Sequence, residues 1–257
     1  TRAMLYFGTG QQTQPTATTG VQYAKGTSST STAQTFYGIW DWDMSTWDGL
    51  SNVKYASLSS GSITRSSLLA QTLVAPPSAS DTTHRYLSNT QVVCWQGDAQ
   101  TDQCTKQGNT MSQYGWMFDM PDPGQATGQF ANQGEQAIYN PAFIQGAVVV
   151  NTAIPPQISA AQCNPNLQSG WTMAFDPASG GGFAENFFAD QGGGFGGGSS
   201  TVGGTKLSGV GTPTSVQYGG KNYLVTQTVT GGAVLIPTNP PSNDNPARVS
   251  WRELVNP

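Results

Sequence analysis

Two stretches of the chain share one plan and decide the fold: Asn140-Pro-Ala-Phe-Ile-Gln-Gly-Ala-Val-Val-Val-Asn-Thr152 and Thr212-Pro-Thr-Ser-Val-Gln-Tyr-Gly-Gly-Lys-Asn-Tyr-Leu-Val-Thr226. Each has a proline near its start, turns at glycine and continues into a hydrophobic strand, which indicates a β-hairpin. Gly170–Gly180 follows the first as a further strand that ends in an Asp-Pro-x-x-Gly turn. Repeated units of a hairpin plus a strand are typical of the blades of a β-propeller.

Short strand-like runs bounded by Gly, Pro, Asn or Thr occur along the whole chain. Helical periodicity is nearly absent, and only Arg65–Leu73 could form a turn or two. The expected strands are 3–8, 34–40, 53–58, 91–95, 114–118, 136–139, 142–144, 147–152, 171–175, 214–218, 223–229, 233–236 and 248–251. At about four strands per blade, they predict an all-β fold, a partial β-propeller of about three to four PQQ-repeat or WD-like blades with long Gly-rich loops.

A propeller usually needs at least about four blades to close. We therefore expect residues 1–257 to be the C-terminal portion of a single propeller domain, with the missing blades in a preceding N-terminal segment or another chain. The start at Thr1 without a signal peptide fits a processed or truncated piece. Residues 180–204 are predicted to be a Gly-rich insertion loop, whose phenylalanines indicate that parts of it dock onto the body or onto a partner.

The composition limits the possible functions. Charged residues make up 9% of the chain, against about 25% in typical soluble proteins, yet 7 Trp, 9 Tyr and 10 Phe supply a core. A net charge of −4 without a Lys/Arg cluster argues against nucleic-acid binding. No apolar run approaches the roughly 18 residues of a membrane span.

The chain has 3 cysteines, Cys94, Cys104 and Cys163. The first two enclose a short polar loop, and we expect a disulfide worth roughly 2–3 kcal/mol in an extracellular setting; two free thiols are the alternative. Cys163 is then free, or pairs with a cysteine of a missing segment or a partner.

The densest acidic cluster holds Asp41, Asp43 and Asp48. Together they are a weak candidate for calcium, which prefers several carboxylate and carbonyl oxygens. The favoured interpretation is a turn at a strand end, with capping aspartates and packed tryptophans; a glycosidase-like carboxylate pair is a third. No catalytic residue is predicted, because the single histidine, His84, lacks a nucleophile-elbow motif around it.

Several phrases recur in a fixed order along the chain. They are 5–10 (LYFGTG), 34–41 (QTFYGIWD), 115–121 (GWMFDMP), 134–141 (GEQAIYNP), 151–155 (NTAIP), Cys163, 170–177 (GWTMAFDP) and 248–254 (RVSWREL). Their order resembles the C-terminal β-propeller of the PilY/PilC family of type IV pilus tip-associated adhesins and biogenesis factors. The resemblance implies a secreted, non-catalytic protein at the pilus tip, the cell surface or the outer membrane. It would bind major or minor pilins in pilus assembly and a host or surface receptor in adhesion.

The chain departs from this family in one respect. Many members carry an EF-hand-like calcium loop where this chain has 183–207, a stretch with only Glu185 and Asp190 as carboxylates. No cofactor is therefore expected. Three loops are the expected contact regions: Thr46–Asn52, Cys94–Cys104 and Gly192–Gly204.

Two alternatives remain open at this stage. The chain could be a structural subunit of an extracellular filament whose open sheet edges pair between neighbours. It could also be a quinoprotein-dehydrogenase-like propeller enzyme, although it has no adjacent cysteine pair.

Overall fold

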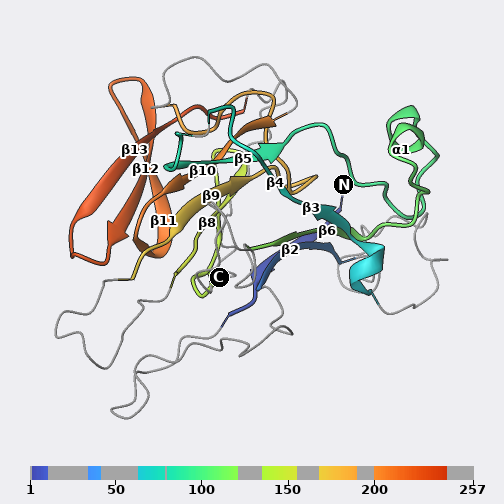
Figure 1. The fold of residues 1–257 in the computed structure, drawn as a ribbon, viewed down its shortest axis with the longest axis horizontal. Coiled ribbons are helices and arrows are strands. Elements are labelled where there is room, and N and C mark those ends of the chain that lie inside the picture. Colours follow the sequence, from blue (N-terminus) through green and yellow to red (C-terminus); the bar gives the residue numbers. More distant parts are fainter. Residues whose placement is uncertain are drawn as a thin grey trace, which may run out of the picture.

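The computed structural model describes residues 2–10, 34–41, 63–78, 80–120, 135–154, 168–189 and 200–241. These residues form three open β-sheets, one short α-helix and one 3-10 turn, and none of the sheets closes into a barrel (Figure 1). The predicted all-β class is confirmed. No helix among them is long and apolar enough to span a bilayer.

The first sheet has four strands in the order β1-β2-β6-β3. Its pairs are antiparallel except that of β3 with β6, which is parallel. Its strands are β1 (Met4–Gly8), β2 (Thr35–Trp40), β3 (Leu69–Gln71) and β6 (Gly115–Asp119).

The second sheet has six antiparallel strands in the order β4-β5-β10-β9-β8-β7. Both β8 and β9 are buried at every residue, as expected for strands covered on both faces. The strands are β4 (Leu73–Val74), β5 (His84–Ser88), β7 (Ala142–Ile144), β8 (Ala147–Asn151), β9 (Trp171–Phe175) and β10 (Ser200–Lys206).

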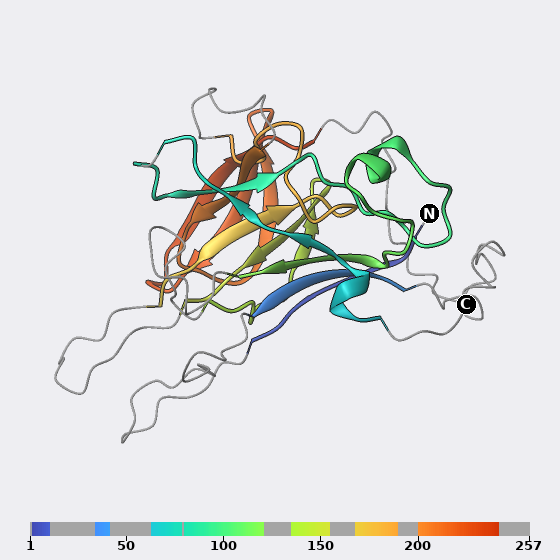
Figure 2. The ribbon, with the colours of Figure 1, turned by 45° about the vertical axis from the view of Figure 1, so that its right-hand side comes forward.

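The third sheet is an antiparallel meander of β11 (Gly209–Tyr218), β12 (Lys221–Thr228) and β13 (Ala233–Thr238). It lies on the opposite side of the second sheet from the first (Figures 1 and 2). The second sheet is thus the middle layer of the molecule.

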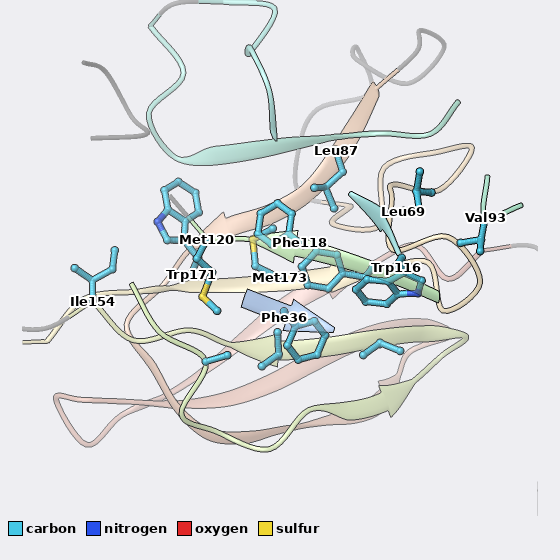
Figure 3. Packing of buried hydrophobic residues seen from close by; sticks show 14 residues of the cluster. Phe36, Leu69, Leu87, Val93, Trp116, Phe118, Met120, Ile154, Trp171 and Met173 are labelled. Carbon is cyan, nitrogen blue, oxygen red and sulfur yellow. The ribbon is translucent and has the colours of Figure 1, made fainter. Parts of the chain in front are cut away.

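Two hydrophobic clusters hold these layers together. In the first, Phe36, Trp116 and Phe118 of the first sheet meet Trp171 and Met173 of the second (Figure 3). In the second cluster, Val149, Ala174 and Val202 of the middle sheet pack with Leu224 and Ile236 of the third. Alternate residues of β8 and β9 therefore belong to opposite clusters, because successive side chains of a strand point to opposite faces.

Both predicted hairpins are confirmed. In β7–β8 the turn is Gln145-Gly146 with φ of 53° and 83°, and in β11–β12 it is Gly219-Gly220 with φ of 58° and 73°. Two-residue turns with positive φ at both positions match the right-handed twist of the flanking strands. The strand at 171–175 is also confirmed and pairs with β8.

The expected insertion loop 180–204 differs from the structure at its end. Residues 200–204 belong to β10, between β5 and β9 in the middle sheet. Gly203 and Gly204 are needed there because a Cβ would fall 2.4 Å from the side chains of Leu87 and Met173, respectively. The predicted docking of phenylalanines is confirmed for Phe187 and Phe188, which are fully buried in the second cluster.

Other expected elements agree with the structure only in part. Residues 91–95 and 136–139 are not strands and contain only single bridges, at Trp95 and Gln136. The stretch 65–73 holds one 3-10 turn at Arg65–Ser67, followed by β3 and the start of β4. The expected strands 53–58 and 248–251 lie outside the described residues.

Candidate interaction site

The Cys94–Cys104 loop is the one expected contact region that the structure describes in full. Cys94 and Cys104 are joined by a disulfide with a Cα–Cα distance of 5.7 Å, and both are buried. The predicted pairing is therefore present. The loop and its helix α1 (Asp102–Lys106) lie at the end of the molecule remote from the third sheet (Figure 1).

Local hydrogen bonds fix the shape of the loop. The side chain of Thr101 accepts from the backbone N–H of Cys104 and caps α1. The Gln100 amide donates to the carbonyl of Asn109 at 3.0 Å and to the hydroxyl of Thr105 at 3.2 Å. A helix of one turn is marginal by itself, so these bonds and the disulfide hold it in place.

An arginine anchor, which we define as Arg2, Trp40, Trp95 and Asp98, ties the loop to the first sheet. The Arg2 guanidinium lies 4.8 Å from the ring centroid of Trp40 and 4.7 Å from that of Trp95. It also pairs with the Asp98 carboxylate at 2.6 Å. Each cation–π contact is worth about 0.5–2 kcal/mol, so the anchor couples the start of β1 to the loop.

Backbone bonds add a second attachment. The N–H of Gln96 donates to the carbonyl of Gln113, and the N–H of Gln113 donates to the carbonyl of Cys94. The side-chain oxygen of Gln113 accepts from the N–H of Cys94 at 2.6 Å. The loop is therefore fixed to the segment that leads into β6.

The outer surface of the loop is polar and nearly neutral. Besides Asp98, which pairs with Arg2, its charges are Asp102 and Lys106, at opposite ends of the same short helix. The exposed side chains between them and around them are Gln100, Thr101, Gln103 and Thr105. A partner of a surface with this composition would be bound through shape and hydrogen bonds rather than through charge.

The environment of His84 is that of a strand start. The Asp81 carboxylate accepts from the backbone N–H groups of Thr83 and His84, from Nδ1 of His84 and from the Tyr86 hydroxyl. Burial would raise the pKa of Asp81, but these hydrogen bonds outweigh it and hold that pKa below its usual value. The geometry gives His84 a capping contact at the first residue of β5.

The calcium candidates are only partly covered by the structure. Asp41 follows β2 directly, and its backbone N–H donates to the carbonyl of Ala3. Asp43 and Asp48 lie outside the described residues. Within the described part of the chain, no group of three or more His, Cys, Asp and Glu side chains gathers into a metal site. Glu185 accepts a hydrogen bond from Asn239.

Other expected site residues are not described. Thr46–Asn52, Cys163, Asp190 and residues 192–199 lie outside the described ranges. Sequence reasoning missed the arginine anchor, because Arg2, Trp40 and Trp95 are far apart in sequence. The only signal was that a tryptophan lies next to Cys94 inside the polar loop.

Fold and loop together define an all-β, disulfide-containing domain with a structured polar loop on its surface. No family model matches the chain. A curated relative from Xylella fastidiosa (strain Temecula1 / ATCC 700964), described as a type IV pilus biogenesis factor PilY1 homolog, is 31% identical over 147 residues. The match covers 56% of this chain and 11% of the relative, so the chain spans only a small part of that protein's length.

A solved structure has a similar fold. The crystal structure of the Pseudomonas aeruginosa PilY1 C-terminal domain superposes with a TM-score of 0.53 and 24% identity, over 92% of this chain and 41% of that one. The resemblance predicted from the sequence is confirmed: part of this chain is similar to a PilY1 homolog, and the chain has the fold of part of the PilY1 C-terminal domain.

Proposed function

We propose that this chain is a non-catalytic interaction module of a type IV pilus protein, acting at the pilus tip in assembly and in surface adhesion. The curated relative from Xylella fastidiosa is named for type IV pilus biogenesis. The observation that carries the proposal is the Cys94–Cys104 loop, which is rigidly held and polar on its outer side. A surface that is ordered before binding loses less conformational entropy when a partner docks.

The partners proposed for this surface are major or minor pilins, and a host or surface receptor. The protein would accordingly lie outside the cell, at the pilus tip or on the outer membrane. Disulfides persist in such oxidising surroundings, and the loop carries one.

We also propose that residues 1–257 are the C-terminal portion of a single propeller, in which the three stacked sheets are successive blades. The outer face of the first sheet supports this, because Leu5 is 54% and Phe7 42% exposed there. Both side chains lie on the face of β1 opposite the first cluster. A further sheet from the preceding segment of the full-length protein would cover them.

The test uses the source organism with its own gene replaced by variants. Ala99→Arg and Asp102→Arg place a bulky charge at exposed positions of the loop whose side chains take no part in the loop-fixing hydrogen bonds described above. Thr230→Arg, on the exposed turn between β12 and β13, is the matched control. Surface pili are counted by electron microscopy, and the protein is measured by immunoblot in sheared pili.

The proposal expects the two loop variants to reduce the protein in the pilus fraction while the control does not. Normal pili that carry normal amounts of both loop variants would overturn the assignment of the loop. Absence of the unmodified protein from purified pili, with unchanged pilus number in a deletion strain, would overturn the pilus function itself.

A further inference from the structure

Strand β11 forms an open edge of the third sheet. Its neighbour in the sheet is β12, and the sheet order gives it no partner on the other side among the described residues. The opposite edge, β13, is paired at its last residues, where Phe188 bridges Thr238 and Ala189 donates to the carbonyl of Pro237. On β11, Asn151 donates to the carbonyl of Gly211, whereas the outer edge along 214–218 has no partner among the described residues.

The turn geometry identifies the free backbone groups. With a two-residue turn, Tyr218 and Lys221 are the closing hydrogen-bonded pair of the hairpin. Bonded and non-bonded pairs alternate along an antiparallel ladder. Residues 214, 216 and 218 therefore bond to β12, and the N–H and C=O groups of Ser215 and Gln217 point outward.

Only the first half of β11 carries the features that normally protect an edge. It has a bulge between Val210 and Thr214, and Pro213 stands at an outward position, where it offers no N–H. The second half, 214–218, has no charge, no proline and no bulge, and all of its residues are exposed. Val216 is 41% and Tyr218 77% exposed on one face.

We propose that this edge pairs with the same edge of a second copy of the chain, as a two-fold symmetric antiparallel dimer centred on Val216. In this register Ser215 lies opposite Gln217 of the other copy and Gln217 opposite Ser215. The outward N–H and C=O groups of Ser215 and Gln217 in both copies are then satisfied. Shifting the register by two residues would pair Ser215 with Ser215, or Gln217 with Gln217, and would leave the other residue opposite Pro213 or Gly219, which loses hydrogen bonds.

The side chains fit the same arrangement. Val216 faces its own counterpart across the axis in a non-hydrogen-bonded pair, where Cα atoms approach to about 4.5 Å. Tyr218 lies opposite Thr214, and a β-branched residue beside an aromatic is a favourable cross-strand pair. Lys221 is the only charged residue of the third sheet. In this register the Lys221 residues of the two chains lie on opposite sides of the two-fold axis.

The dimer joins two three-stranded sheets into one continuous sheet. A contact of this length is smaller than a standard stable interface, so the association is concentration-dependent. Closed two-fold pairs are the commonest form of self-association. This inference is independent of the proposed pilus function and would hold for the purified chain alone.

The test is sedimentation velocity of the purified chain over a wide concentration range. Gln217→Pro removes the outward N–H and leaves the bonds to β12 intact, whereas Gln217→Thr keeps the N–H and is the control at the same position. The unmodified chain and Gln217→Thr should form dimers with similar affinity. Gln217→Pro should weaken the dimer roughly tenfold or more, since each interface loses two hydrogen bonds.

A charge-pair experiment tests the register. Val216→Lys and Val216→Glu should each weaken dimerisation, because like charges then meet at the axis. A mixture of the two variants should dimerise again, because opposite charges meet there. A chain that stays monomeric at all concentrations, a dimer insensitive to Gln217→Pro, or a mixture without rescue would overturn the proposal.

Discussion

Gly180 lies directly against the indole ring of Trp116, so that a Cβ on Gly180 would fall 2.2 Å from the ring. The same indole donates from Nε1 to the carbonyl of Pro177 at 2.9 Å. The buried amide of Gln71 donates to the carbonyl of Ser179 at 2.8 Å. The Asp-Pro-x-x-Gly turn after β9 thus ties the middle sheet to the first, and its glycine is required by this contact.

We predict that Gly180→Ala is strongly destabilising. Gly180 has a φ of +71°, which costs an alanine about 1–2 kcal/mol, and overpacking against Trp116 adds about 1–3 kcal/mol. Gly108→Ala is the matched control, since Gly108 also has a φ of +71° and has open space around its Cβ position. Urea denaturation of both variants measures the difference, and equal losses would contradict the role assigned to Trp116.

A second prediction concerns the buried ion pair of Arg85 and Glu135, each 2% exposed at the side chain. The guanidinium donates to both carboxylate oxygens, at 2.7 and 2.6 Å, and its Cζ lies 4.1 Å from the ring centroid of Trp171. Removing one partner leaves a buried charge uncompensated, at a cost of about 3–5 kcal/mol. We expect Glu135→Gln to lower the free energy of unfolding by that order.

The control for this variant is Asp119→Asn. Asp119 pairs with Arg65 on the surface, with side chains 44% and 50% exposed. Exposed pairs contribute about 0–1 kcal/mol, so this variant should retain nearly full stability in the same denaturation experiment. If both variants lost the same unfolding free energy, burial would not explain the larger contribution of the Arg85–Glu135 pair to stability.

This pair also shows what the sequence could not reveal. β5 was not predicted because His84-Arg-Tyr-Leu-Ser88 places a cation in mid-strand without apolar alternation. Arg85 is tolerated in the core only because Glu135 and Trp171, far away in sequence, neutralise and cover it. Long-range partners of this kind leave no local periodicity.

Glycine explains why β10 was also not expected from the sequence. β10 was expected to be loop because Gly203 and Gly204 continue a Gly-rich run, yet close packing by Leu87 and Met173 makes glycine necessary in this strand. By contrast, both hairpins were predictable, since their turn residues and hydrophobic strands are adjacent in sequence. The disulfide of the candidate site was expected from short spacing, whereas the arginine anchor depends on tertiary contacts.

The third prediction is an alkaline loss of stability that depends on Tyr6. The Tyr6 hydroxyl donates to the carbonyl of Pro177 at 3.2 Å. Burial, with a smaller effect of the Asp176 charge, raises the pKa of Tyr6 from 10.0 to about 12. The unfolded chain then ionises first, so stability contributed by neutral Tyr6 is complete below pH 10 and is lost as the pH rises towards 12.

Tyr6→Phe should lower the free energy of unfolding by about 1 kcal/mol at neutral pH, because the hydrogen bond to Pro177 is lost. The free energy of unfolding of this variant should also fall less steeply between pH 10 and 12. Part of the slope remains, because burial and the hydrogen bond to Asp81 also raise the pKa of Tyr86 to about 12. Urea denaturation as a function of pH measures both effects. Identical slopes for the variant and the unmodified chain would refute the assignment to Tyr6.

The fourth prediction separates the disulfide loop from the layered body. Replacing both Cys94 and Cys104 by serine should lower the free energy of unfolding by about 3 kcal/mol, because the unfolded chain regains the entropy of a short closed loop. The sheets should persist, since Cys94 and Cys104 belong to neither hydrophobic cluster. Hydrogen exchange should therefore accelerate at α1 and remain slow in β8 and β9.

Arg2→Gln provides the complementary variant. It keeps the disulfide but removes the cation between Trp40 and Trp95 and the ion pair with Asp98. Exchange should then increase at the start of β1 and around Trp95, while α1 stays protected by its cap and by the bridge. Equal loosening of α1 in both variants would show that the anchor, rather than the disulfide, orders the whole loop.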